Sequence, residues 1–367
     1  MLKTFSVSGI RNFPGPVTLD LSKTRDYQFN TEYIRDGIVT NALLIGKNST
    51  GKTNLGLALG DICNTFSLIQ SGSSRLEKQE SLYLNADNGR GTACFRYIFQ
   101  FGDNEVGYSY EKSDPRTLLW ERLELNGRAV FDYRNDRQEM VEQRLELIGA
   151  DGLNWKYVDP SFSLVAYFSN SIPKERLGVL GQLRDFVNGM RMLSSSYSDV
   201  TNKRASYVDK IISHGRVADF QQFLSDFGIE ANLKEIKEAD GSRSLYFEHS
   251  QRMIPFAESC SSGTETLLQF YAELEIENSF RFLYLDEFDA YCHFELAALL
   301  VRYFGEKRSC QTICTTHNTS LVRNDVMRPD CIFQIDAGKI RSLADSTDRE
   351  IRQGNNVEKL LRNGEFE

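Results

Sequence analysis

Eight residues early in the chain have the types and the spacing of a loop that binds phosphate. Residues 46–53 read GKNSTGKT and fit the pattern G-x-x-x-x-G-K-[ST] at every fixed position. In such a loop the glycines let backbone N–H groups turn around phosphate oxygens, and the following helix adds partial positive charge. The sequence therefore predicts a site for ATP and Mg²⁺. Its nucleotide-binding residues would be Gly46, Asn48, Ser49, Thr50, Gly51, Lys52, Thr53 and Asn54.

Individual residues of this loop have different expected roles. Lys52 would reach the β- and γ-phosphates and act in catalysis, and the hydroxyl of Thr53 would bind Mg²⁺. The loop must lie between a strand and a helix, and the sequence predicts both. Residues 38–45 are an apolar run typical of a buried strand, and apolar residues recur at helical spacing over 55–62. A simple glycine-rich turn is therefore the weaker interpretation.

Two adjacent acids late in the chain supply the carboxylates that such a loop needs. Asp286 and Glu287 follow the apolar residues 282–285, FLYL, which form a short strand pattern. An apolar strand that ends in two acids is a Walker B pattern, in which Asp286 would hold Mg²⁺, directly or through water. Glu287 would orient and deprotonate the attacking water. A strand that merely runs into an acidic loop explains less once the phosphate loop is present.

Two further segments carry polar residues that could contact the γ-phosphate. His317 follows the strand pattern ICTT and could sense hydrolysis, although a lone histidine there is more often structural. Ser262 and Gly263 come before a helical pattern with an apolar face. A serine–glycine helix start can bind an anion or serve as an ordinary N-cap. Its position just before the Walker B strand favours the anion site.

Between the two halves of this site, the sequence predicts a β-rich block followed by helices. Alternation near 5–7 and 17–21, and again over 95–125, predicts antiparallel strands, and the aromatic stripe is more typical of a core than of a nucleotide platform. Residues 163–168 are a further strand candidate. Helical spacing occurs over 178–192 and 217–227, and a hairpin is expected to turn at 239–241. The polar residues 70–80 are expected to form an exposed linker.

The composition limits the classes of function. The chain has 367 residues, and its net charge of −8 argues against a generally basic nucleic-acid-binding surface while leaving room for a local basic groove. No apolar run is long enough to span a bilayer and no secretory signal begins the chain, so we expect a cytoplasmic protein without a membrane partner. Seven cysteines without a C-x-x-C pair are typical of reduced thiols. A zinc site near Cys292, Cys310 and Cys314 is the weaker interpretation.

The order of the motifs resembles that of the ABC-type ATPases of the SMC, RecF and OLD group. The resemblance implies an α/β fold, a P-loop ABC-type ATPase head with a β-rich lobe and a helical insertion. It implies that Ser262 and Gly263 form the signature motif, which in that group contacts ATP held by the opposite subunit. Asp289 would lie at the D-loop position and His317 at the switch-histidine position. The Q-loop glutamine is unclear, with Gln70 and Gln79 as candidates.

More narrowly, the chain resembles compact ATPases of bacterial anti-phage and abortive-infection systems, including the ATPase subunits of PARIS and Septu and AbiL- and RloA-like proteins. The segments TNALLIGKNSTGKTNLGLAL, ESCSSGTETLL and NNVEKLLRNGEF carry this resemblance. Phe288 departs from it, because ABC ATPases often have proline there. The expected domains are a P-loop ATPase core from residues 1–70 and 250–345, an antiparallel β lobe from 88–135, a helical insertion with a hairpin from 160–249, and a C-terminal tail from 346–367.

Three functions compete on this evidence. The first is an ATPase subunit of a defence system that senses infection and controls a separate effector such as a nuclease, in homo-oligomers built from ATP-dependent dimers. The second is a RecF-like DNA-repair ATPase that binds DNA across a head dimer, and the acidic balance weighs against it. The third is a scaffold with a structural nucleotide, and the intact Glu287 weighs against it. About fifty residues follow His317, too few for a typical domain, so we expect no nuclease on this chain.

Overall fold

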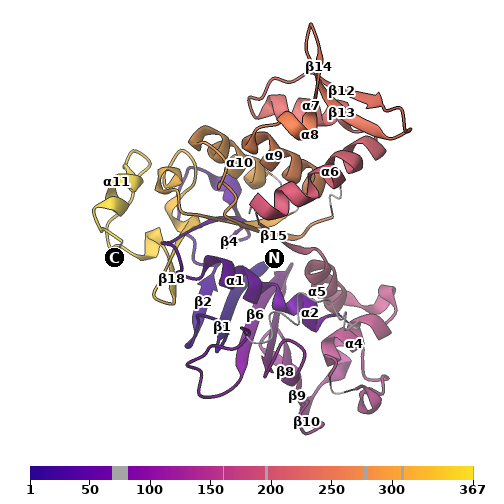
Figure 1. The fold of residues 1–367 in the computed structure, drawn as a ribbon. Coiled ribbons are helices and arrows are strands. Elements are labelled where there is room, and N and C mark those ends of the chain that lie inside the picture. Colours follow the sequence, from indigo (N-terminus) through magenta and orange to yellow (C-terminus); the bar gives the residue numbers. More distant parts are fainter. Residues whose placement is uncertain (68–81, 160, 195–196, 277–278, 307–309, 367) are drawn as a thin grey trace.

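The computed structural model describes residues 1–67, 82–159, 161–194, 197–276, 279–306 and 310–366, which form an α/β fold with two large sheets (Figure 1). The central sheet has the strand order β11-β15-β16-β5-β17-β18, in which the first five strands pair in parallel and β18 pairs antiparallel. These strands are β5 (Asn41–Ile45), β11 (Met190–Ser194), β15 (Phe282–Asp286), β16 (Gln311–Thr316), β17 (Ile332–Asp336) and β18 (Lys339–Ser342). The expected linker at 70–80 lies wholly outside the described residues.

The parallel arrangement of the central sheet positions the predicted motifs. Every residue of β5, β15 and β16 is buried, as expected of parallel strands covered on both faces. The phosphate loop follows β5, the two acids end β15, and His317 follows β16. Because neighbouring parallel strands end at the same edge, three segments far apart in the sequence meet there.

Helices cover both faces of this sheet. On one face α1 (Lys52–Leu59) packs so closely on β15 that a Cβ at Gly56 would lie 2.4 Å from the Tyr284 ring. On the other face lie α9 (Ser262–Phe270) and α10 (Phe294–Glu306), whose Phe270 and Phe304 rings are 5.4 Å apart (Figure 1). The helix α2 (Asp61–Thr65) continues from α1, and α5 (Gly178–Asn188) lies beside it. None of the described helices is long and apolar enough to cross a membrane.

The second sheet is antiparallel, with the order β10-β9-β8-β7-β6-β1-β2. The expected strands of residues 95–125 are confirmed, but they continue into the N-terminal strands because β6 pairs with β1. The aromatic stripe is core, as expected: the Tyr97 hydroxyl is buried and donates to the carbonyl of Ala58 in α1 at 3.0 Å. The strands are β1 (Leu2–Ser8), β2 (Val17–Asp20), β6 (Ala93–Phe101), β7 (Asn104–Lys112), β8 (Leu118–Leu125), β9 (Arg128–Arg134) and β10 (Glu139–Gln143), with β3 (Ile34–Arg35) and β4 (Ile38–Val39) as a separate pair.

Two predicted elements differ in the structure. The prediction of a strand at 163–168 is wrong, because Leu164–Ser171 is the helix α4. In its first turn, the N–H of Ala166 donates to the Ser163 hydroxyl. A short apolar run cannot distinguish a buried strand from a buried helix. The helix expected over 178–192 ends at Asn188, and Met190–Ser194 becomes strand β11, paired with β15, the strand that ends at Asp286. The region 160–249 therefore contributes a strand to the central sheet, and the domain boundaries stay a prediction.

The remaining insertion projects from the α9 side of the molecule (Figure 1). It contains α6 (Tyr197–Ser213), α7 (Val217–Asp226) and a small sheet of β12 (Leu233–Lys237), β13 (Arg243–Glu248) and β14 (Met253–Pro255), followed by α8 (Phe256–Ser259). The expected hairpin is confirmed: it turns at 239–241, where Gly241 has a left-handed φ of 88°.

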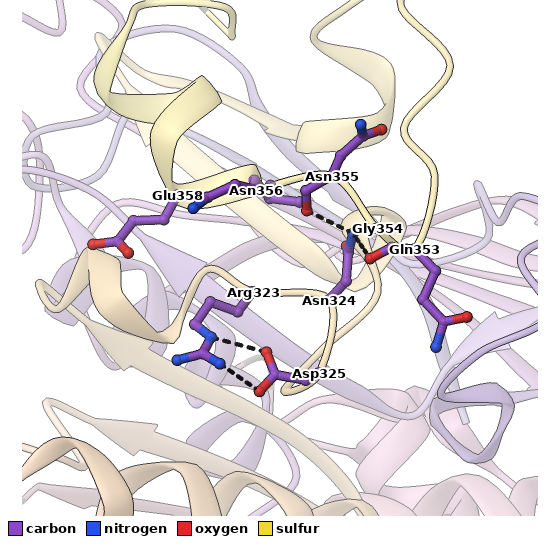
Figure 2. Close-up of a pocket in the computed structure, with 9 residues that line it drawn as sticks. Arg323, Asn324, Asp325, Gln353, Gly354, Asn355, Asn356 and Glu358 are labelled. Atoms are coloured by element: carbon purple, nitrogen blue, oxygen red, sulfur yellow. Dashed lines mark hydrogen bonds and ion pairs between the residues drawn. The ribbon is translucent and has the colours of Figure 1, made fainter.

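The C-terminal segment ends in α11 (Val357–Arg362) and packs against the chain that follows His317. The Asn324 amide donates to the carbonyls of Arg352, Gln353 and Asn355 at 2.9 to 3.2 Å. Figure 2 shows the pocket beside this contact, about 430 Å³ in volume, with the Arg323–Asp325 ion pair on one wall. The tail is therefore held by Asn324, which lies seven residues after His317 in the sequence.

Candidate functional site

The loop after β5 has the backbone that its glycines predict. A Cβ at Gly46 would lie 2.7 Å from the Thr50 hydroxyl and 2.8 Å from Ile335, so no side chain fits there. Gly51 has a φ of 107°, which L side chains rarely adopt, and Ser49 is left-handed with a φ of 65°. The loop therefore turns tightly before α1, whose N-terminus faces the same space that a phosphate needs.

Lys52 extends back across this loop. Its ammonium group donates to the carbonyls of Gly46 at 3.0 Å and Lys47 at 3.2 Å, and lies 2.9 Å from Nε2 of His317. Burial lowers the pKa of Lys52, while the carboxylates of Glu287 and Asp286 act in the opposite sense. The positive charge of Lys52 thus lies inside the loop, where a triphosphate would meet it.

Two oxygen ligands from distant parts of the chain meet beside this lysine. The Thr53 hydroxyl donates to Oδ2 of Asp286 at 2.7 Å, and the Thr315 hydroxyl donates to Oδ1 at 2.9 Å. Asp286 is buried, with 4% of its surface exposed. A hydroxyl and a carboxylate at this separation fit Mg²⁺, which prefers oxygen ligands. The seven cysteines are free thiols, and no cluster of three potential metal-binding side chains occurs among the described residues.

Glu287 and His317 lie on the open side of the same site. Oε1 of Glu287 is 3.4 Å from Nε2 of His317, and half of the Glu287 side chain is exposed. The backbone of Glu287 is left-handed, with a φ of 50°, and its N–H donates to the Thr315 hydroxyl at 2.8 Å. Backbone strain of this kind often accompanies functional residues. Because of this conformation, Asp286 and Glu287 lie in different environments, the first buried and the second half-exposed.

The predicted signature residues lie elsewhere. Ser261 is the N-cap of α9, and its hydroxyl accepts from the N–H of Thr264 at 3.2 Å. Ser262 is exposed and Gly263 is half-buried. Among the described residues, no hydrogen bond or ion pair joins either of them to the phosphate loop. The structure therefore brings together residues 46–53, Asp286, Glu287 and His317, and leaves Ser262 and Gly263 apart from them.

Three residues that contact the candidate site were not predicted from the sequence. The Asn12 side chain donates to the carbonyl of Thr50 at 3.3 Å and accepts from the Asn54 amide at 2.8 Å. Thr315 holds Asp286, and the Thr316 hydroxyl donates to Asp289 at 2.7 Å. Burial raises the pKa of Asp289. Both Q-loop candidates, Gln70 and Gln79, lie outside the described residues.

Comparisons with known proteins give one family match over part of the chain and several similar solved structures. Residues 193–323 match the family described as AAA domain, putative AbiEii toxin, Type IV TA system. No curated protein is significantly similar in sequence. Similar solved structures include an SMC head bound to the C-terminal winged-helix domain of ScpA, with 15% identity over 94% of this chain and 98% of that one and a TM-score of 0.47.

Two more solved structures are similar at the same level. The SMC head domain from Thermotoga maritima has 16% identity over 93% of this chain and 97% of that one, with a TM-score of 0.45. An Smc head bound to the C-terminal domain of ScpA, derived from Pyrococcus furiosus, has 13% identity over 94% and 97%, also with a TM-score of 0.45. The family match covers 131 of the 367 residues and includes Asp286, Glu287 and His317 but not the phosphate loop. The geometry described above shows an α/β fold in which the loop and these residues meet at one edge of the central sheet.

Proposed function

We propose that the chain is the ATP-hydrolysing subunit of a bacterial anti-phage, abortive-infection system, in which it senses infection and controls a separate effector such as a nuclease. The observation that carries the ATPase assignment is the meeting of Lys52, Thr53, Asp286, Glu287 and His317 at one edge of the central sheet. They come from α1, from the end of β15 and from the end of β16, so their meeting is a property of the fold and not of local sequence.

Each residue has its own role in the proposed reaction. Lys52 balances charge on the β- and γ-phosphates, and Glu287 accepts the proton of the attacking water from the open side of the site. His317, in contact with both, would report whether the γ-phosphate is present. Mg²⁺, held by Thr53 and Asp286, would neutralise charge on the phosphate oxygens.

A second subunit would complete the site. Ser262 is exposed at the start of α9, and α9 lies on the opposite face of the sheet from α1 (Figure 1). We therefore propose that Ser262 and Gly263 contact ATP in a partner copy, in ATP-dependent dimers that assemble in the cytoplasm. The description of the matching family, which names a toxin and a toxin–antitoxin system, supports the defence role. The net charge of −8 disfavours the alternative, a RecF-like ATPase that holds DNA.

An ATPase assay tests the catalytic half of this proposal. The purified chain should release phosphate from ATP only when Mg²⁺ is present, and Lys52→Ala should abolish ATP binding and turnover because the loop loses its one buried charge. Turnover that persists in Lys52→Ala would contradict the site.

Expression together with the neighbouring genes tests the defence half. A tag on this chain should co-purify a protein that those genes encode, and the amount recovered should change between ATP and no nucleotide. If no such protein is recovered in either condition and the chain instead binds DNA in a salt-sensitive manner, the DNA-repair alternative replaces the defence role.

A further inference from the structure

One arginine of the insertion connects both sides of the turn that carries Ser262 and Gly263. Arg204, on α6, forms an ion pair with Glu265 in the first turn of α9. Its other terminal nitrogen donates to the backbone carbonyl of Ala257. Ala257 lies in α8, just before the turn, and Glu265 lies just after it. A single guanidinium group therefore bridges the two ends of residues 257–265.

The bridge is largely shielded from solvent. Only 6% of the Glu265 side chain and 24% of the Arg204 side chain are exposed, so solvent screens the pair weakly. Removing one partner of a buried pair leaves an uncompensated charge and is strongly destabilising. The planar fork of arginine reaches two acceptors at once, which the single ammonium group of lysine cannot reproduce.

Apolar contacts attach the flanks of the turn to the same insertion. The Phe256 ring packs on Phe220 of α7 at 5.9 Å and on Phe247 of β13 at 4.9 Å. Beyond α9, Tyr271 begins a π-helix (Tyr271–Glu275) and packs on Phe220 at 5.1 Å. These rings fix the two flanks, and Arg204 adds a polar link across the turn itself.

We propose that Arg204 is a positioning residue for the signature, which sets the place of Ser262 and Gly263 and thereby the activity of the ATP site in the partner subunit. The inference rests on the proposed function, in which the signature acts across the dimer. It makes the insertion a route by which a bound partner controls ATP turnover, because a shift of α6 moves the turn through Arg204. The phosphate loop of the same chain is not part of this route.

The test begins with Arg204→Lys, which keeps the charge and loses the double contact. We expect ATP turnover to fall about 10-fold or more, since a small misplacement of a catalytic group has effects of this size or larger. The dissociation constant for a fluorescent ATP analogue should stay within about 2-fold, because the analogue binds the loop of its own chain. Lys203→Ala is the matched control: it alters the neighbouring exposed residue of α6 and should leave both quantities unchanged.

Mixing two variants distinguishes action across the dimer from damage within one chain. Excess Lys52→Ala chain added to Arg204→Lys chain should restore turnover, because one composite site then has an intact loop and an intact signature. Ser262→Arg mixed with Lys52→Ala serves as the reference pair. If the reference pair recovers activity and the Arg204→Lys pair does not, Arg204 does not act through the signature and the inference is wrong.

The remaining outcomes are equally decisive. If neither mixture recovers activity, the composite site of the proposed function fails, and the inference that rests on it fails too. If Arg204→Lys does not fold by circular dichroism, Glu265→Gln replaces it, since it weakens the same contact and keeps the volume of the side chain. Glu265→Gln should show the same loss of turnover and the same recovery with Lys52→Ala. Wild-type turnover in a folded Arg204→Lys or Glu265→Gln chain would also overturn the inference.

Discussion

At the scale of residues, two adjacent acids have different environments and so different predicted roles. Asp286 is buried and accepts hydrogen bonds from Thr53 and Thr315, which suits a group that holds a cation. Glu287 follows it with a left-handed backbone and a half-exposed side chain, which suits a group that meets water. The difference arises from where β15 ends, since Asp286 is its last residue.

Replacing Glu287 with glutamine should separate binding from hydrolysis. Glu287→Gln keeps the size of the side chain and removes its basicity, so turnover should fall by about 10²-fold or more while ATP still binds. Phosphate release and binding of a fluorescent ATP analogue measure the two effects. Glu295→Gln, which changes an exposed acid in α10, is the control and should behave as wild type. Unchanged turnover in Glu287→Gln would remove Glu287 from the mechanism.

At the scale of elements, the contact between α1 and β15 holds the loop and the acids in register. Gly56 of α1 lies against the Tyr284 ring, and the Tyr284 hydroxyl donates to the carbonyl of Lys52. Small residues at such crossings let a helix approach a strand closely. The spacing between Lys52 and Asp286 therefore depends on the absence of a side chain at Gly56.

Gly56→Ala should disturb this contact. The new methyl group would lie 2.4 Å from the Tyr284 ring, so we expect the free energy of unfolding to fall by about 1–3 kcal/mol from overpacking. At Gly60, by contrast, the nearest atom to a Cβ is 3.5 Å away, so Gly60→Ala is a matched control that should cost little. Urea denaturation measures both variants. Equal stability of Gly56→Ala and Gly60→Ala would show that the contact relaxes freely.

A buried carboxylate joins the second sheet to α4. Glu121 of β8 accepts hydrogen bonds from the Leu164 N–H at 2.6 Å, the Ser163 hydroxyl at 2.8 Å and the Tyr108 hydroxyl at 3.0 Å. Burial raises the pKa of Glu121, although these donors oppose the shift. The pair of Ser163 and Glu121 explains why residues 164–171 begin a helix, because both satisfy N–H groups at its N-terminus.

The raised pKa of Glu121 predicts a pH dependence of stability. Above the ordinary glutamate pKa and below the raised one, the folded state binds more protons than the unfolded state, so the free energy of unfolding falls as pH rises through this interval. Glu121→Gln removes the titrating group and should gain stability relative to wild type as pH rises. Urea denaturation of both chains across this range measures the difference. Parallel pH profiles would contradict the prediction.

At the scale of the whole molecule, residues from opposite ends of the chain build one site. Gln311, in β16, fixes this closure: its side chain accepts from the Leu2 N–H and donates to the carbonyls of Leu2 and Val39, each at 2.8 Å. The first strand of one sheet is thereby tied to the central sheet. The loop after β5 and the acids at the end of β15 meet because both strands pair with β16, which carries Gln311.

The proposed composite site also predicts the oligomeric state. Glu287→Gln with ATP and Mg²⁺ should form a dimer, because bound ATP that is not hydrolysed holds two signatures against two loops. Lys52→Ala under the same conditions should remain a monomer, since it lacks the nucleotide. Size-exclusion chromatography with light scattering measures both masses. A monomer in Glu287→Gln with ATP would contradict the composite site, whatever the turnover of the wild type.

The sequence by itself predicted the residues of the candidate site and located most local elements. The phosphate loop, the two acids after β15 and His317 after β16 follow fixed patterns, and periodicity located α1, α7, the β6–β8 strands and the hairpin of β12 and β13. Such signals are local, because a glycine at positive φ or an alternating strand depends on nearby residues.

Only the tertiary structure decided which surfaces meet. Residues 164–171 are a helix because Ser163 and Glu121 satisfy its first N–H groups, and Met190–Ser194 is a strand because it pairs with β15. Asn12 reaches the phosphate loop, and Arg204 spans the turn that carries Ser262 and Gly263, through contacts between segments far apart in the chain. Burial and strand pairing between such distant segments depend on the packing of the whole chain. They cannot be predicted from the spacing of nearby residues in the sequence.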